Sequence, residues 1–385
     1  MRDVFIVEAV RTPVGKLGGS LAVTRPDDLA ATVVKALVDR FHADPEQIDE
    51  VYFGDANQAG EDNRNVARMA ALLAGLPTSV PGATVNRLCG SGMEAVFSAS
   101  RAIACGDEQV CIAGGVESMS RAPWVVQKPE KPFPRTSETM HSTTLGWRMV
   151  NPDMPDEWTV SLGEGAEILA DRYGITREQQ DEFALDSHRK AAAAWERGAF
   201  ADEVVPVPGV DLERDENIRA DTTLEKLAQL KPVFRKDGTV TAGNSSPMND
   251  AASAVLLVSE ADQPLARIAS RASSAVEPQL YGIGPVEAAN KALARAGIGW
   301  GDLAAVELNE AFAAQSLACL AEWKELDPAI LNVNGGAIAL GHALGNSGTR
   351  LLTTLVCELR RRGGGWGLAT MCIGVGQGVA MVIEA

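Results

Sequence analysis

Three short segments of this 385-residue chain combine a thiol or an imidazole with closely spaced glycines. The first runs from Asn86 to Gly92 and places Cys89 at the start of a predicted helix. A helix N-terminus lowers the pKa of a thiol and so favours the nucleophilic thiolate. The flanking glycines let backbone N–H groups approach a substrate oxygen closely. The segment indicates nucleophilic catalysis; the alternative is a small side chain packed in a tight turn.

The second segment is a glycine-rich loop, residues 334–348, that contains His342 and leads into another predicted helix. A nucleophilic thiol needs a nearby base, and imidazole is the usual one. The loop lacks the Gly-Lys-Ser/Thr ending of a phosphate-binding loop, so we do not interpret it as one. A loop histidine bonded to the backbone is the alternative.

The third segment places Cys372 at the end of a predicted strand, before alternating glycines. A thiol can donate and accept a proton, so this position suits general acid–base catalysis. Asn309 and Glu310 lie where a strand becomes a helix, from where they can orient a water or an imidazole. For Glu310 the alternative is an ordinary charge in the first turn of a helix.

The composition limits the class of protein. Hydrophobic residues make up 46% of the chain, which is enough for a large core, and the net charge is −16. A surface this acidic repels nucleic acid and anionic lipid, and we therefore expect neither as a partner. An anionic ligand would need a local basic patch. The six cysteines are far apart and none has zinc-site spacing, so we expect no disulfide framework and no metal site. No signal peptide or membrane span is recognisable, and we expect a cytoplasmic protein.

Alternating strands and helices predict an α/β fold. Strands are expected over residues 4–10, 48–53, 109–113, 254–259, 266–272, 304–308, 367–371 and 379–383. Helices are expected over residues 27–40, 64–75, 91–105, 161–173, 177–197, 285–297, 310–322 and 347–362.

The middle of the chain has a different character. Residues 123–155 are rich in proline, and Trp124, Trp147 and Trp158 lie in or near them. We expect an ordered loop excursion there, because aromatic side chains favour burial. Residues 211–236 are charged and predicted to be irregular.

The two α/β parts show a weak internal repeat. A Ser-Gly pair opens a helix at residues 91–92 and again at 347–348, and each helix is followed by a glycine and a strand. This indicates a duplicated topology with the middle inserted in the first half. Chance similarity between two α/β units is the alternative.

Taken together, the motifs resemble those of the thiolase family over nearly the whole chain. The matching segments are residues 7–13, Asn86–Gly92, Gly114–Arg121, Thr241–Ser246, Asn309–Ala313, Gly341–His342 and Cys372–Gly378. Within the family, residues 54–68 and 143–147 are most similar to 3-oxoadipyl-CoA thiolases.

The resemblance implies a fold and a domain organisation. The fold would be two duplicated α/β halves in α-β-α-β-α layers with an inserted loop domain. Residues 1–118 with 249–268 would form the N-terminal half, and 269–385 the C-terminal half. The insertion, residues 119–248, would bind CoA and make the contacts of a homotetramer.

The resemblance also implies a ping-pong acyl transfer. Cys89 would attack the 3-keto carbon of a 3-oxoacyl-CoA, His342 would take the thiol proton, and Cys372 would protonate the departing acetyl-CoA carbanion. His342 and a water on Asn309 would bind the CoA thioester oxygen. The backbone N–H groups of Cys89 and Gly374 would bind the oxygen of the acyl group on Cys89. CoA would be a substrate, with no metal or redox cofactor.

CoA carries phosphates, and the insertion contains candidate cations for them: Arg219, Lys231, Arg235 and Lys236. A solvated face is the alternative for these cations, and for Lys236 we favour it. By resemblance Arg219 lies by the adenine, while the pantetheine channel is lined by Phe234, Ala242, Ser246 and Phe312.

The chain departs from the family pattern at several positions. Ala343 replaces the usual proline after the catalytic histidine, and Ala251 replaces a glycine. Tyr281 stands where a methionine is expected, at a position that resembles one in the acyl pocket, so the phenol would change the pocket's size and polarity. The segment Ser161–Glu167 replaces a more regular motif. The Cys89–His342–Cys372 set is intact.

Three other functions compete with a 3-oxoadipyl-CoA thiolase. One is a general thiolase for acetoacetyl-CoA or medium-chain 3-oxoacyl-CoA. Another is a ketosynthase-type condensing enzyme, which usually carries histidine or asparagine where this chain has Cys372. The last is a non-catalytic lipid carrier, for which the complete Cys–His–Cys set would be unexplained.

Overall fold

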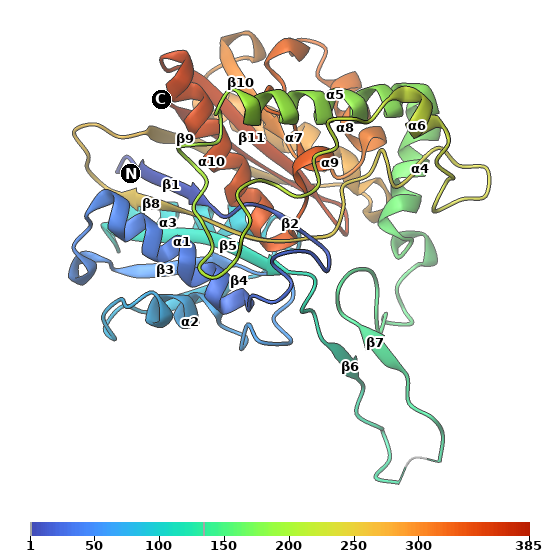
Figure 1. Ribbon diagram of the computed structural model, residues 1–385, viewed down its shortest axis with the longest axis horizontal. Coiled ribbons are helices and arrows are strands. Elements are labelled where there is room, and N and C mark those ends of the chain that lie inside the picture. The colour runs from blue at the N-terminus through green and yellow to red at the C-terminus, as the bar shows by residue number, and fades with distance from the viewer. Residues whose placement is uncertain (1, 134) are drawn as a thin grey trace.

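A large mixed β-sheet forms the centre of the molecule in the computed structural model, which describes residues 2–133 and 135–385 (Figure 1). The strands are β1 (Phe5–Arg11), β2 (Gly15–Lys16), β3 (Glu50–Gly54), β4 (Gly82–Val85), β5 (Val110–Ser118), β6 (Trp124–Val126), β7 (Met140–Ser142), β8 (Asn249–Val258), β9 (Ala266–Ala275), β10 (Leu303–Leu308), β11 (Trp366–Ile373) and β12 (Gln377–Glu384). The α-helices are α1 (Pro26–Phe41), α2 (Val66–Leu73), α3 (Ser91–Cys105), α4 (Leu162–Tyr173), α5 (Arg177–Glu196), α6 (Leu224–Ala228), α7 (Gly284–Ala296), α8 (Ala313–Glu322), α9 (Ala337–Leu340) and α10 (Leu344–Arg362).

Each predicted strand and helix is present, and the differences lie at the ends. β5 continues to Ser118 and β8 begins at Asn249, because the two strands pair along their whole length, up to Ser118 opposite Asp250. The last residues of β5 and the first residues of β8 include glycine and charged residues, which are uncommon in strands. The two predicted strands were therefore too short at these ends. The helix predicted from residue 310 begins only at Ala313.

The sheet has the same strand order in both halves. The full order is β10-β11-β12-β9-β1-β8-β5-β3-β4. In the first half β4, β3 and β5 are parallel, and β8 and β1 follow antiparallel. In the second half β10 and β11 are parallel, and β12 and β9 follow antiparallel. β1 pairs with β9 and joins the halves, and the repeated order agrees with the predicted duplication.

Three apolar clusters fill the spaces between the layers. The central cluster packs α3 and α10 between the two half-sheets. A second cluster packs α1 and α2 on the outer face of the first half, and a third packs α7 and α8 on the outer face of the second. The layers therefore follow the predicted α-β-α-β-α arrangement (Figure 1).

Glycines allow the two central helices to approach each other near their N-termini. A Cβ atom on Gly92 of α3 would lie 2.6 Å from the carbonyl oxygen of Gly345, and one on Gly348 of α10 would lie 2.3 Å from the nitrogen of Met93. Larger residues would force the helices apart. The crossing brings Cys89, before α3, toward His342, before α10.

The insertion includes a two-stranded hairpin, β6 and β7, that projects from the body (Figure 1). The expected burial of the aromatic residues of this region is wrong in the single chain: Trp124 of the hairpin is 65% exposed, and Trp147 and Trp158, which follow it, are 41% and 39% exposed. The reason is that β6 pairs only with β7 and has no larger sheet to pack against. Residues 211–236 are largely irregular as predicted, apart from the short helix α6.

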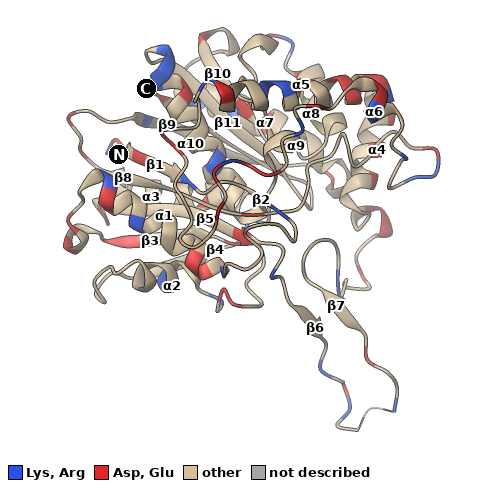
Figure 2. Cartoon of the chain, in the orientation of Figure 1, with Lys and Arg blue, Asp and Glu red and all other residues tan. Residues whose placement is uncertain are grey.

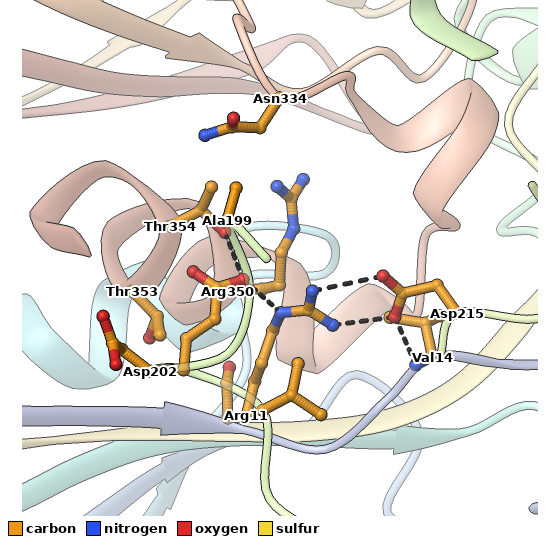
Figure 3. Close-up of polar contacts among 12 residues, drawn as sticks. Arg11, Val14, Ala199, Asp202, Asp215, Asn334, Arg350, Thr353 and Thr354 are labelled. Atoms are coloured by element: carbon orange, nitrogen blue, oxygen red, sulfur yellow. Dashed lines mark hydrogen bonds and ion pairs between the residues drawn. The ribbon is translucent and has the colours of Figure 1, made fainter. Parts of the chain in front are cut away.

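A buried ion network ties the insertion to the core (Figure 3). Arg11 of β1 donates from Nη1 to Asp215, at 2.7 Å, and from Nε to Glu203, at 2.6 Å. Thr354 of α10 donates to Glu203, and Arg350 lies 3.4 Å from Glu307 of β10. Paired charges therefore join β1 to the insertion, and the Thr354 hydroxyl of α10 completes the contact through Glu203.

The proposed boundary between the two halves, at residue 268, lies within β9. Among the described residues, no helix is both long and apolar enough to span a bilayer.

Candidate active site

Cys89 lies in a turn whose backbone is held by side chains. Leu88 has a φ of 48°, which non-glycine residues rarely adopt. The side-chain oxygen of Asn86 accepts from the Leu88 N–H at 2.8 Å, and the Leu88 carbonyl accepts from the Ser91 hydroxyl at 2.6 Å. These bonds fix the turn that places Cys89 directly before Gly90, the N-cap of α3.

Burial dominates the chemistry of the Cys89 thiol. The residue is 9% exposed. Burial raises the pKa of the thiol to about 11, although the N–H groups of Gly374 and of Cys89 itself hydrogen-bond to the sulfur and oppose the rise. The lowered pKa expected from the helix N-terminus is therefore wrong for this buried site, and the thiol is protonated at neutral pH. The two N–H groups nevertheless point toward the Cys89 sulfur, where negative charge would develop.

Cys372 lies beside Cys89 at the end of β11. It is 2% exposed, and burial, followed by the nearby Cys89, raises the pKa of its thiol well above the ordinary value. The turn that follows is tight: Val375 and Gly376 have φ of 64° and 74°, and a Cβ on Gly376 would lie 2.2 Å from the Val276 carbonyl oxygen. This turn directs the N–H of Gly374 back toward Cys89.

His342 is held by its backbone and by buried neighbours. Its N–H donates to Asn249 Oδ1 at 2.8 Å, and Asn249 Nδ2 donates to the Gly15 carbonyl. The preceding Gly341 has a φ of 109°, and a Cβ there would lie 2.7 Å from the Asn249 side chain. Asn309 Nδ2 lies 3.4 Å from His342 Nδ1. Burial, followed by the positive Arg350, lowers the pKa of the imidazole to about 4, so it is neutral at neutral pH.

The structure thus groups the predicted chemical side chains at one end of the sheet. Cys89 lies beside Cys372, and Asn309, directly after the strand next to β11, lies beside His342. Within the described residues no hydrogen bond joins the Cys89 thiol to His342. The resting state is therefore a neutral thiol and a neutral imidazole.

Glu310 does not contact the imidazole. It is buried outside α8, and its carboxylate accepts from Ser187 Oγ at 2.6 Å, Asn332 Nδ2 at 2.8 Å and Ile338 N at 3.2 Å. It is therefore neither a surface charge in a first helical turn nor a partner of His342. It holds the glycine-rich loop that leads to His342.

Tyr281 packs against Cys372 and lies within electrostatic range of Cys89. It is 3% exposed and packs with Cys372 and Ala311. Its hydroxyl donates to the Leu162 carbonyl at 2.8 Å. A Cβ on Gly165 would lie 2.7 Å from the tyrosine ring, so that glycine makes room for the ring. The Tyr281 phenol therefore lies near the thiols, and its hydroxyl proton is already donated to the Leu162 carbonyl.

The predicted pantetheine residues form a group next to the thiols. The rings of Phe234 and Phe312 meet edge to face, with centroids 6.0 Å apart. The Ser246 N–H donates to the carbonyl of Ala311, which precedes Phe312, and Ala242 is exposed nearby in the chain. A Cβ on Gly163 would lie 2.2 Å from the Phe234 ring.

The predicted cations differ in availability. Arg235 is paired with Glu164 and with Asp171, at 2.6 Å each, so its charge is already matched. Lys231 and Lys236 are exposed in the segment that follows α6. Figure 2 shows basic residues on the loop beside α6 and α4. Arg219 is also exposed, and its backbone N–H donates to Nδ1 of the buried His188 at 3.2 Å.

Sequence reasoning missed three residues that position the site. Ser347 contacts His342 Nδ1, Asn249 holds the His342 backbone, and Glu117 accepts from the N–H of Gly345 in α10. They resemble ordinary helix and strand residues in the sequence. Only the adjacent glycine-rich motifs signalled that their surroundings are crowded.

A large open cavity of about 1360 Å³ lies elsewhere, at the opposite end of the first half-sheet. Phe5, His42 and Val258 line it, and none of the predicted site residues does. Among the described residues, no group of three or more His, Cys, Asp or Glu side chains is arranged to hold a metal ion.

Comparison with known proteins covers the whole chain. Residues 4–261 match the family model for the thiolase N-terminal domain, and residues 262–385 match the model for the thiolase C-terminal domain. The chain is 54% identical to a beta-ketoadipyl-CoA thiolase of Pseudomonas putida, with 100% of both chains covered. It is 52% identical to a 3-oxoadipyl-CoA/3-oxo-5,6-dehydrosuberyl-CoA thiolase of Escherichia coli, again with 100% of both covered.

A solved structure gives the same result. The crystal structure of human mitochondrial 3-ketoacyl-CoA thiolase in complex with CoA superposes with a TM-score of 0.93 at 40% identity. The match covers 100% of this chain and 98% of that one.

Proposed function

This chain belongs to the thiolase family of acyltransferases, and we propose that it cleaves a 3-oxoacyl-CoA with CoA, and runs the reverse condensation, through a thioester on Cys89. The observation that carries the proposal is the grouping of Cys89 with Cys372 and the Gly374 N–H. The Asn309 N–H donates to the carbonyl of Thr370, two residues before Cys372, and the Asn309 side chain lies 3.4 Å from His342 Nδ1. A nucleophile, a base, a second acid–base group and oxyanion donors are the parts that acyl transfer requires.

In the first half-reaction, the Cys89 sulfur attacks C3 of the substrate while its proton passes to His342. The C3 oxyanion accepts from the N–H groups of Cys89 and Gly374. The C2–C3 bond then breaks, which leaves an acyl group on Cys89 and an acetyl-CoA enolate. His342 and a water on Asn309 stabilise the enolate oxygen, and Cys372 protonates C2.

In the second half-reaction, Cys372 takes the thiol proton of an incoming CoA. The CoA sulfur attacks the acyl carbonyl, the C–S bond to Cys89 breaks as the shortened acyl-CoA forms, and the departing Cys89 sulfur takes its proton back from His342. The raised pKa values of both thiols support the first half-reaction, because each thiol is protonated at its start and gives up its proton only as bonds form and break.

CoA is the substrate that the insertion binds in this proposal. Phe234, Phe312, Ser246 and Ala242 line the pantetheine arm, and Arg219 lies by the adenine. The edge-to-face contact of Phe234 with Phe312 supports the first part. Residues 119–248 accordingly form a CoA-binding domain inserted between an N-terminal half, residues 1–118 with 249–268, and a C-terminal half, residues 269–385.

For the acyl chain we propose 3-oxoadipyl-CoA or a similar short 3-oxoacyl-CoA. The support is the activity for which the two relatives that share over half of their residues with this chain are named. One observation favours the alternative, a general acetoacetyl-CoA or medium-chain thiolase. The side chains next to Gly374 and the thiols are Leu88, Leu162 and Tyr281, and none offers a cation to a terminal carboxylate.

A single assay tests both the thiolase reaction and the preferred acyl chain. Cleavage is measured with CoA and equimolar 3-oxoadipyl-CoA, acetoacetyl-CoA and 3-oxooctanoyl-CoA. The proposal expects CoA-dependent cleavage, an acyl adduct on Cys89 by mass spectrometry, and the highest kcat/KM for 3-oxoadipyl-CoA. A higher value for acetoacetyl-CoA would transfer the proposal to the general thiolase, and the lack of any adduct would refute the mechanism.

We further propose that the chain forms a homotetramer in the cytoplasm. The projecting hairpin supports self-association, because Phe133 and Trp124 are 88% and 65% exposed there, and large apolar side chains favour a covering partner. The six free cysteines fit a reducing compartment. Light scattering of the full chain measures the oligomeric state directly.

A further inference from the structure

The imidazole of His342 has two buried neighbours on the side of Nδ1. Ser347 Oγ lies 2.6 Å from Nδ1, and Asn309 Nδ2 lies 3.4 Å from it. All three residues are at most 7% exposed. Nδ1 is therefore withdrawn from solvent, and Nε2 is the nitrogen that remains to exchange a proton with a reacting group.

The hydroxyl of Ser347 has one proton and two neighbours that can accept it. Its oxygen lies 2.8 Å from the Ala343 carbonyl, one helical turn earlier, as well as 2.6 Å from His342 Nδ1. A carbonyl oxygen can only accept. When the hydroxyl donates to Ala343, Oγ therefore presents a lone pair to a proton on Nδ1. Nε2 is then unprotonated, which is the form that a general base needs.

Asn309 fits the same tautomer once its carboxamide is turned over. Its Oδ1 is buried and has no hydrogen-bond partner among the described residues, while its Nδ2 faces Nδ1. A half-turn of the carboxamide exchanges the two atoms. Oδ1 then accepts from Nδ1–H, and Nδ2 is released to hold a water, so that each buried polar atom has a partner.

The opposite tautomer has a different consequence. If the hydroxyl donated to Nδ1, the proton of the imidazole would lie on Nε2, which then could not take a proton from a thiol. Burial keeps the imidazole neutral, with its pKa lowered to about 4. The position of the proton, rather than the net charge, therefore decides whether His342 can act as a base.

We infer that Ser347 is a positioning residue that holds the proton of His342 on Nδ1 and keeps Nε2 available to Cys89. This inference rests on the proposed role of His342. When the Cys89 proton moves to Nε2, the sulfur keeps its electron pair and bonds to C3. The Nδ1–H···Oγ contact then becomes a charge-assisted hydrogen bond that stabilises the imidazolium.

The test compares Ser347→Ala with a matched variant, Ser316→Ala. Ser316 of α8 is also buried and donates to a carbonyl one turn earlier, Phe312 at 3.1 Å, without touching a histidine. We expect Ser347→Ala to lower kcat about 10- to 100-fold with KM changed by less than about threefold, because a charge-assisted hydrogen bond is lost. Ser347→Thr keeps a hydroxyl and restores most of kcat, and Ser316→Ala keeps the wild-type value. Equal kcat in Ser347→Ala and Ser316→Ala would overturn the inference.

A spectroscopic readout on the wild-type chain does not depend on activity. The chain has four histidines, so ¹⁵N-labelled histidine gives few signals, and the signal of His342 is the one absent from His342→Gln. In the wild type we expect the proton on Nδ1 at neutral pH, and a proton on Nε2 would overturn the inference. A wild type without thiolysis or an acyl adduct would refute the proposed function instead, while the tautomer would still report on Ser347.

Discussion

The two halves of the sheet place different side chains at equivalent strand ends. β3 and β5 form their last pair at Gly54 and Gly115, and β10 and β11 form theirs at Leu308 and Thr370. Asp55 directly follows β3, and Asn309 directly follows β10. In the second strand of each pair, Glu117 lies two residues after Gly115 in β5, and Cys372 lies two residues after Thr370 in β11. The duplicated frame thus offers two carboxylates in one half and an amide with a thiol in the other.

Each strand end contacts the central helix of the other half. Glu117 accepts from the N–H of Gly345, in the first turn of α10, at 2.8 Å. Cys372 lies beside Cys89, which precedes α3. The first contact holds the helix that follows His342, since a carboxylate stabilises a helix N-terminus. The second contact sets a neutral proton donor beside the nucleophile.

The contrast between Glu117 and Cys372 explains why only the strand end with Cys372 takes part in the proposed reaction. Burial raises the pKa of Glu117 to about 7, and it raises the pKa of Asp55 well above the ordinary value. A carboxylate at position 372 would place negative charge against the sulfur that must become anionic. A thiol there is neutral until it transfers its proton, so it tolerates the anionic state of Cys89.

The strongest test of this division is Cys89→Ala. Because the sulfur forms the covalent intermediate, we expect thiolysis to fall to background and the acyl adduct to disappear from the mass spectrum. Cys105→Ala is the matched control, since Cys105 is an exposed thiol at the other end of α3. Residual acyl transfer in Cys89→Ala, with the adduct on another residue, would assign the nucleophile elsewhere.

The next largest effect is expected from Cys372→Ala. Removal of an acid–base group lowers the rate by about 10²- to 10⁴-fold. Iodoacetamide should still alkylate Cys89 in this variant, which a steady-state assay and a mass spectrum check together. If Cys372→Ala keeps more than about a tenth of the activity, a different group protonates the enolate, and the contrast with Glu117 loses its basis.

The pH dependence of alkylation tests the resting state of the nucleophile. With a pKa of about 11, the thiolate fraction of Cys89 rises about tenfold for each pH unit between pH 7 and pH 10. The rate of iodoacetamide labelling at Cys89 should follow this rise, as peptide mass spectrometry at each pH measures. A constant rate from pH 6 upward would indicate a preformed thiolate–imidazolium pair instead.

Glu117→Gln should have the smallest effect on activity and a distinct effect on stability. The glutamine oxygen can still accept from Gly345, so we expect kcat to fall by less than about tenfold. The pKa of Glu117 lies above its ordinary 4.5 in the folded protein, so the folded state binds more protons between about pH 4.5 and pH 7. The free energy of unfolding therefore falls as the pH rises through this window.

We expect Glu117→Gln to reduce that fall by on the order of 1–3 kcal/mol, as urea unfolding at several pH values measures. Asp55 retains part of the slope because its pKa is also raised. An unchanged slope would show that Glu117 is already charged in the folded protein.

The sequence was most informative where the backbone is crowded. Gly341 and Gly376 mark His342 and the turn after Cys372 because a Cβ at either position would overlap a neighbour. The same requirement applies where α3 crosses α10, at Gly92 and Gly348. The glycine motifs therefore identified the segments that carry the site, and the alternation of strands and helices identified the fold class.

The sequence was least informative about the partners of those segments. Nothing in the residue types of Ser347 and Asn249 indicates their partner, yet one contacts the ring of His342 and the other its backbone. The aromatic residues of the hairpin were expected to be buried, but β6 and β7 pair only with each other. Such contacts depend on segments that are distant in the chain.

By itself, the amino-acid sequence determined the turns, the residue types and the order of elements that hold Cys89, His342 and Cys372. Only the tertiary structure decided the protonation of these groups. A free thiol before a helix would have a lowered pKa, but the packing of both half-sheets around Cys89 removes water from it and raises that pKa to about 11. Solvation is set by all the segments that surround a side chain, and no local pattern of residues contains that information.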